Sequence, residues 1–444
     1  MNNLRILKFY NPFSSRINVQ LPGGPSFLPD EIRCLHWEQY PLESLPASFN
    51  PRNLVELEMP HSRFRQIWSG VKAFSSITNV VNLCCTSLVE VPSSIGFCTK
   101  ITHLNLNECK LISSFPGCLQ LTRLECLSLR NCKKITRFPE IPKVTKRLNL
   151  SGTAIEVPPS IRRQFQLVKL ELVSCTSLNS LASGIGKLRS LQLLDLSGCS
   201  KLARLPKSIC NIKSLESLLL RECPRLKKLP EDLGNLESLK RIDTTFSGIK
   251  ELPSSISRLQ NLVDLGYSGY VGMTLPSLGA LTSLQELQLM NCGIKEIPKS
   301  LGFSVSLREL NLSSNDFRSL PVTIKGLTNL TILNLSNCKN LQRVPQLPSG
   351  LELVNMPSCS SLESLPMLFT EKIHLIAKIY VKLGCAYLGL KSQIGSAIKV
   401  LDLHYHYRSR QVTVLNCWVA LFALLFHAKA IILHFRTFNV IAGL

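Results

Sequence analysis

The chain of 444 residues is 45% hydrophobic and 18% charged, which excludes an intrinsically disordered protein. Its net charge of +22 is scattered without a long basic run, and only three Trp and eight Tyr are available for base stacking, so we expect no nucleic-acid partner. The 17 Cys form no Cys-x-x-Cys pair and no signal peptide precedes them, which predicts reduced thiols, no metal site and a location in the cytoplasm or the nucleus.

Residues 1–31 predict an entry segment with one irregular repeat at Leu4, Leu7 and Phe9. From residue 32 onward one pattern recurs, L-x-x-L-x-L-x-x-C followed by L-x-x-L-P. It is complete between Leu191 and Pro206, and again between Leu215 and Pro230. About 15 repeats of 21 to 24 residues fill residues 32–366, with first positions at 32, 54, 78, 101, 124, 145, 167, 191, 215, 239, 262, 284, 307, 330 and 351.

This period is that of leucine-rich repeats, so we predict an α/β leucine-rich-repeat solenoid shaped as a curved horseshoe. Each L-x-L segment is expected to form a short strand, and the strands together a parallel sheet on the concave face. One repeat cannot bury its leucines alone, so neighbouring repeats must bury each other's. Proline in the second half of most repeats disfavours long helices and predicts extended segments or short helical turns on the convex face.

The ninth position of the repeat is usually Cys, with Thr153 and Asn315 as variants. We interpret these Cys as small buried residues near backbone groups that need hydrogen bonds, not as metal or redox ligands. Trp37 occupies a leucine slot and, like Trp68, is interpreted as core. The repeat at Leu262 contains Gly266, Gly269 and Gly272, which we expect to loosen its strand, and Tyr270 in place of Cys. The run predicts a kink in the arc or, as the alternative, a contact loop.

The beginning of the repeat array carries the most specific signal. Its two blocks are Leu28-Pro-Asp-Glu-Ile-Arg-Cys-Leu-His-Trp-Glu-Gln-Tyr-Pro-Leu42 and Ser62-Arg-Phe-Arg-Gln-Ile-Trp-Ser-Gly70. They resemble the opening of the repeat region in plant intracellular immune receptors of the TIR–NB-ARC–leucine-rich-repeat class. The run Asn149–Ile155 and the recurrent Pro-Ser-Ser-Ile are also similar to that family.

The resemblance implies that the repeats recognise a pathogen effector or a guarded host protein. It also implies that they pack on a nucleotide-binding domain and hold it inactive. The chain itself lacks a TIR domain and a P-loop, because Gly184-Ile-Gly-Lys187 is followed by Leu188. We therefore expect no cofactor, and no cluster of catalytic residues stands out, so we predict no enzymatic activity.

A partner is expected to contact the polar side chains around the strand leucines on the concave face. Their mixed charge suits a protein epitope. The candidates are Lys169, Glu171, Gln192, Asp195, Glu216, Arg221, Glu222, Lys240, Arg241, Asp243, Gln285, Glu286, Gln288, Arg308, Glu309, Asn311, Thr331 and Asn334.

Residues 367–444 form an atypical basic and apolar tail in which the repeat stops. Three interpretations stay open: non-coding sequence read as protein, helices that are packed or disordered, and a membrane anchor around residues 412–433. Asn416, His427 and Lys429 argue against such a span. The pair His404 and His406 has no further ligand nearby and is interpreted as a polar patch.

One alternative function remains, that of a free-standing cytosolic leucine-rich-repeat scaffold or adaptor. Such proteins share the L-P-x-x-I rhythm, but they usually carry Asn in the ninth position and lack the His36-Trp37 block. A cell-surface receptor would need a signal peptide and cysteine caps.

Overall fold

The computed structural model describes residues 3–9, 25–66, 77–84, 87–115, 120–268 and 278–363, and the backbone of 378–380. The chain divides into two compact units, Met1–Leu262 and Val263–Leu444. The predictions for Trp68, Tyr270, the two tail histidines and residues 412–433 lie outside the described residues. No helix in the described part is long and apolar enough to cross a membrane.

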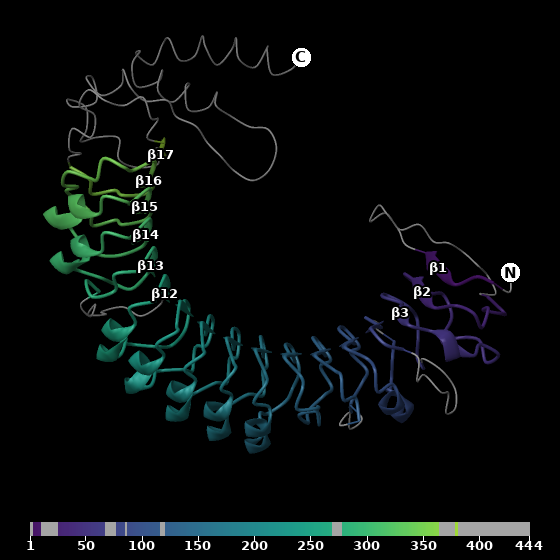
Figure 1. The fold of residues 1–444 in the computed structure, drawn as a ribbon. Coiled ribbons are helices and arrows are strands. Elements are labelled where there is room, and N and C mark those ends of the chain that lie inside the picture. Colours follow the sequence, from purple (N-terminus) through teal and green to yellow (C-terminus); the bar gives the residue numbers. More distant parts are fainter. Residues whose placement is uncertain are drawn as a thin grey trace, which may run out of the picture. The chain divides into compact units, whose positions relative to one another are not determined.

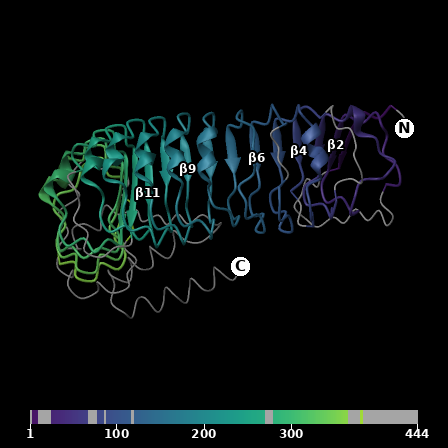
Figure 2. The same ribbon diagram turned by 90° about the horizontal axis from the view of Figure 1, so that it is seen from below.

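The first unit is built on parallel strands that pair in chain order from β1 to β11. Figure 2 shows the labelled strands from β2 to β11 side by side in that order. The strands are β1 Ile6–Phe9, β2 Cys34–Trp37, β3 Glu56–Glu58, β4 Val80–Asn82, β5 His103–Asn105, β6 Cys126–Ser128, β7 Arg147–Asn149, β8 Lys169–Glu171, β9 Leu193–Asp195, β10 Ser217–Leu219 and β11 Arg241–Thr244.

The second unit continues the same architecture from β12 to β17, again with parallel pairs. Its strands are β12 Asp264–Ser268, β13 Glu286–Met290, β14 Glu309–Asn311, β15 Ile332–Asn334, β16 Leu353–Asn355 and β17 Lys378–Tyr380. Gly266 does not loosen β12, because that strand has five residues and pairs with β13 over all five. The expectation of a loosened strand is therefore wrong for Gly266, while Gly269 and Gly272 lie outside the described residues.

Leucine positions determine the register of the parallel strands in both units. The fourth position of one repeat faces the fourth position of the next, as in Leu148 with Leu170 and Leu170 with Leu194. These three side chains are fully buried, and so are most leucines of the first, fourth and sixth positions. The leucine-rich-repeat solenoid predicted from the pattern is therefore confirmed. In each unit the hydrophobic core lies between the strands and the segments that connect them.

The side of the repeats opposite the strands carries short 3₁₀ helices, as Figure 1 shows for each unit. Proline precedes most of them and supplies the extended backbone at their start. One isoleucine or leucine in each of the five-residue helices is buried. The helices are η1 Pro51–Asn53, η2 Ser93–Phe97, η3 Pro159–Arg163, η4 Ser183–Lys187, η5 Lys207–Asn211, η6 Glu231–Asn235 and η7 Ser254–Arg258 in the first unit, and η8 Lys299–Phe303 and η9 Val322–Gly326 in the second.

Strand β17 lies beyond residue 366, where the repeat was expected to stop. It pairs with β16 in the regular register, so that Ile379 faces Val354. The spacing Ile376-x-x-Ile379-x-Val381 fits the L-x-x-L-x-L pattern, although its ninth position is Gly384, with Cys385 one place later, and no L-P follows. This spacing was the signal that could have predicted the strand.

Candidate functional site

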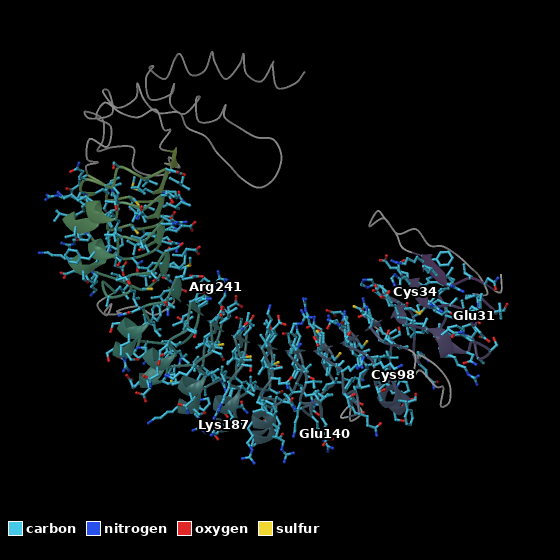
Figure 3. The ribbon with its side chains drawn as sticks, viewed as in Figure 1. Glu31, Cys34, Cys98, Glu140, Lys187 and Arg241 are labelled. Carbon is cyan, nitrogen blue, oxygen red and sulfur yellow. The ribbon has the colours of Figure 1, made fainter. Side chains whose placement is uncertain are left out.

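The exposed side of each sheet, here called the strand face, carries the side chains that alternate with the buried leucines. In β8, Leu170 is buried while Lys169 on one side of it is exposed and Glu171 on the other is half-buried. The alternation of a strand therefore places the third and fifth positions of every repeat on this face. Figure 3 shows Arg241 on the strand side of the first unit, with Lys187 and Glu140 on the opposite side.

The ninth-position Cys point into the interior. The Sγ of Cys199 donates to the carbonyl oxygen of Leu172 at 3.1 Å, and the Sγ of Cys223 donates to that of Leu196 at 3.2 Å. Burial raises the pKa of Cys132 and of Cys338 to about 12, so these thiols stay protonated at neutral pH. The structural interpretation is confirmed for the whole set: Cys109, Cys132, Cys175, Cys199, Cys223, Cys292, Cys338 and Cys359 are all buried.

Asn315 forms more hydrogen bonds with backbone groups than a Cys does in the same position. Its Nδ2 donates to the carbonyl oxygens of Leu289 at 2.7 Å and Leu312 at 2.8 Å. Its Oδ1 accepts from the backbone N–H groups of Cys292 at 3.0 Å and Ile294 at 3.1 Å. The ninth position thus links successive repeats by hydrogen bonds and takes no part in the strand face.

Four predicted site residues in the fifth position hold the turn that ends the strand. The Oδ1 atoms of Asp195 and Asp243 accept from the backbone N–H groups two residues later, at 2.9 and 3.0 Å. Asn311 and Asn334 do the same at 3.0 Å each. Side chains that mimic a backbone turn in this way favour Asp and Asn. These residues are therefore better explained by the repeat's own geometry than by a partner.

The eighth position adopts a left-handed backbone conformation in both units. Glu222, a predicted site residue, has φ of 53° there, and Asn291 has φ of 54°. Phe246 occupies the same position with φ of 58° while its side chain is 49% exposed. A bulky residue in this region costs about 1 kcal/mol relative to the right-handed regions. The eighth position is thus selected mainly by backbone geometry.

Several predicted site residues pair with one another across the strand face. Lys240 Nζ lies 2.9 Å from Glu216 Oε2, and Arg221 Nη1 lies 3.6 Å from Asp243 Oδ2. The amide of Asn311 donates to Gln288 Oε1 at 2.9 Å. Because most of these groups are exposed, each pair contributes at most about 1 kcal/mol to stability.

A second group of predicted residues makes no side-chain interaction that stabilises the fold. Their side chains make no hydrogen bond or ion pair with any described residue of the chain, and they stand in the second, third or fifth position of the repeat. They are Lys169, Glu171, Gln192, Gln285, Glu286, Arg308 and Glu309. Thr331 Oγ1 donates to the Arg308 carbonyl oxygen at 3.1 Å, and Arg241 makes a further interaction.

Sequence reasoning missed part of the same face. Arg147 on β7 and His103 on β5 stand in the third position and are joined by a 2.8 Å contact between Arg147 Nη2 and His103 Nε2. Applying the third-position rule to the earlier repeats would have found them. Within the described ranges, no three His, Cys, Asp or Glu side chains converge as metal ligands do.

Comparison with known proteins gives the family. A family model described as "Disease resistance protein RPS4B-like, leucine-rich repeats" matches residues 188–383, and a leucine-rich-repeat model matches residues 53–72. The disease resistance-like protein DSC1 of Arabidopsis thaliana is 33% identical over 414 residues, which are 84% of this chain. The chain is a leucine-rich-repeat region of the plant disease resistance family. The predicted resemblance to TIR–NB-ARC–leucine-rich-repeat proteins is thereby confirmed.

This repeat region spans only part of its relatives. It covers 32% of DSC1, and 16% of the disease resistance protein RPP2A of Arabidopsis thaliana, to which it is 38% identical over 41% of its own length. Among solved structures, a leucine-rich-repeat protein of Leptospira interrogans is 27% identical, with a TM-score of 0.45, over 61% of this chain and 88% of that one. Repeat regions of this kind typically serve protein interaction.

Proposed function

We propose that this repeat region is the protein-binding recognition module of a plant intracellular immune receptor, acting in the cytoplasm or the nucleus. Residues 32–366 would be the recognition domain, and its partner a pathogen effector or a guarded host protein. The observation that carries the proposal is the division of labour within each repeat. Leucines fill the core, the ninth position links repeats, and the fifth position often holds the turn, while second and third positions such as Lys169, Glu286 and Glu309 have no task in the fold.

Side chains that do not stabilise the fold can be substituted without loss of stability, so their identity can be selected for binding a partner. Polar residues of mixed charge on a rigid sheet offer electrostatic complementarity with little loss of conformational freedom in the backbone on binding. The third positions carry charge of both signs. Arg147 and Lys169 are basic and Glu56 is acidic in the first unit, while Glu286 and Glu309 are acidic in the second.

A two-hybrid screen of a pathogen effector library against the whole chain tests the proposal. Each interacting effector is then tested against a strand-face variant with Lys169→Glu, Glu286→Lys and Glu309→Lys. The matched control carries Lys207→Glu, Glu140→Lys and Glu231→Lys on the opposite side, with the same change in net charge. We expect the strand-face variant to lose the interactions and the control to keep them. The reverse pattern would contradict the proposal.

The second part of the proposal is autoinhibition, in which the repeats pack on a nucleotide-binding domain and hold it inactive. It is supported by the family membership of the chain. Co-expression of this chain with the TIR and nucleotide-binding region of a relative should reduce the cell death that this region triggers alone in leaf tissue. Cell death that is unchanged at matched protein levels would contradict it.

A further inference from the structure

Four third-position side chains stand in a row on the strand face of the first unit. The parallel register aligns His103 on β5 with Cys126 on β6, Cys126 with Arg147 on β7, and Arg147 with Lys169 on β8. Neighbouring strands lie about 4.8 Å apart, so the row spans about 14 Å across the sheet. Arg147 and Lys169 are exposed, and Cys126 is half-buried.

The Arg147 guanidinium is held over β6 by neutral groups. Its Nη2 lies 2.8 Å from His103 Nε2, two strands away. A guanidinium only donates hydrogen bonds, so Nε2 accepts and the imidazole is neutral. The His103 proton is then on Nδ1, which lies 2.9 Å from Thr102 Oγ1. Burial raises the pKa of the Cys126 thiol, and the nearby Arg147 guanidinium lowers it by a smaller amount. The guanidinium is therefore oriented by His103 without a counter-ion.

Two other lysines of the strand face are paired with carboxylates, unlike the cations of this row. Lys146 Nζ lies 3.0 Å from Glu125 Oε1, and Lys240, further along the unit, has its Nζ 2.9 Å from Glu216 Oε2. Arg147 and Lys169 have no carboxylate within ion-pair distance among the described residues. A guanidinium that is already oriented, with N–H groups left over, loses little entropy when it binds a carboxylate through two parallel hydrogen bonds.

The surroundings do not suit a single-stranded nucleic acid. Glu171 is close enough to raise the pKa of the Cys126 thiol, after the larger effect of burial, so negative charge lies beside the row. This charge repels a phosphate and a carboxylate alike and does not distinguish them. The third and fifth positions of β5–β9 also contain no Phe, Tyr or Trp on which bases could stack.

We propose that Arg147 and Lys169 form a carboxylate-binding site for an acidic segment of the protein partner, with His103 as a positioning residue for Arg147. This inference rests on the proposed function, because it names the chemistry of a partner at the strand face. The site takes Asp or Glu side chains spaced to meet two adjacent strands.

Fluorescence anisotropy with the whole chain tests the site. The probe is a labelled 12-residue peptide of alternating Glu and Gly, and a 12-nucleotide oligothymidine serves for comparison at the same salt concentration. The variant carries Arg147→Ala and Lys169→Ala. The control carries Lys187→Ala and Lys207→Ala on η4 and η5, which removes the same charge from the opposite side. We expect the Kd for the peptide to rise at least tenfold in the variant and less than twofold in the control.

A second variant, His103→Ala, separates positioning from charge. It keeps both cations and should raise the Kd for the peptide three- to tenfold, while circular dichroism stays as in the unmutated chain. Equal weakening by the variant and the control would overturn the site. So would oligothymidine binding that is tighter than peptide binding and lost in the variant. Lys169 is shared with the two-hybrid variant, but Glu286 and Glu309 belong to the other unit, so a two-hybrid variant with only Glu286→Lys and Glu309→Lys tests the proposed function after either failure.

Discussion

Within one repeat, some positions are selected because their side chains stabilise the fold, and others carry side chains that make no such contact. Asp195 in the fifth position holds a turn, and Cys199 in the ninth donates a hydrogen bond to the preceding repeat. Lys169 in the third position does neither. The candidate site residues predicted from the sequence include both classes. The sequence shows that Asp195 is polar, but it does not show that its carboxylate accepts a hydrogen bond from a backbone N–H group of the turn.

Asn315 offers a test of the ninth-position hydrogen bonds. We expect Asn315→Ala to lower the free energy of unfolding by about 2–4 kcal/mol, because it removes four hydrogen bonds and leaves the buried N–H groups of Cys292 and Ile294 without their acceptor. Cys338→Ala in the next repeat breaks one weak hydrogen bond to Leu312 and should cost less. Urea denaturation measures both. An equal loss in the two variants would contradict the assigned roles.

The buried thiols predict a pH dependence. Burial raises the pKa of Cys132 and Cys338 to about 12, above the value of about 8.5 in an unfolded chain. The neutral thiol is thus favoured by folding, so its contribution to stability is complete below pH about 8.5 and is lost as the pH rises towards 12. The urea midpoint should therefore fall above pH 9, and by less in a Cys132→Ala, Cys338→Ala variant. The same fall in both proteins would argue against the thiols.

Alkylation distinguishes these thiols from the accessible ones. Cys34 and Cys126 are half-buried, whereas Cys132 and Cys338 are buried. In the folded protein at pH 8, we expect iodoacetamide to label the first two well before the others, as peptide mass spectrometry can show. Rapid labelling of Cys132 without denaturant would contradict its position in the core.

Among the elements, the strands were predictable and the short helices less so. Fixed leucine spacing predicts every strand from β2 to β16, because only one register buries all the leucines. Strand β17 was missed because the Cys after its apolar triplet is one place out of register and no L-P follows. The helices η2 to η9 are single 3₁₀ turns set by the preceding extended residue, which a pattern of leucines does not show.

Ala182 shows that the backbone before these helices is set by the fold and not by proline alone. It precedes η4 with φ −66° and ψ 147°, close to the φ −69° and ψ 143° of Pro206 before η5. We expect Ala182→Pro to stabilise the protein by about 0.4–1 kcal/mol, because proline restricts the unfolded chain and fits the native φ. Thermal unfolding measures it, and Pro206→Ala should show the opposite change. A lower melting temperature for Ala182→Pro would contradict this account.

At the scale of the whole molecule, the net charge of +22 does not describe the strand face. The third positions are basic at Arg147 and Lys169 in the first unit and acidic at Glu286 and Glu309 in the second. A partner that contacts both units would need acidic and basic regions of its own. The division into two units at Leu262 was not predicted, since the leucine spacing continues across that point.

We expect a protein partner to bind the second and third positions of the strand face. Hydroxyl-radical footprinting of the chain with and without an effector found in the two-hybrid screen tests it most directly. The third-position residues Leu193, Ile332 and Leu353 are half-buried and oxidisable, and Phe303 and Val322 on η8 and η9 are 68% and 67% exposed. We predict that the effector protects some of the first three from oxidation and leaves Phe303 and Val322 unchanged. Protection of Phe303 and Val322 with none at the strand face would contradict the claim.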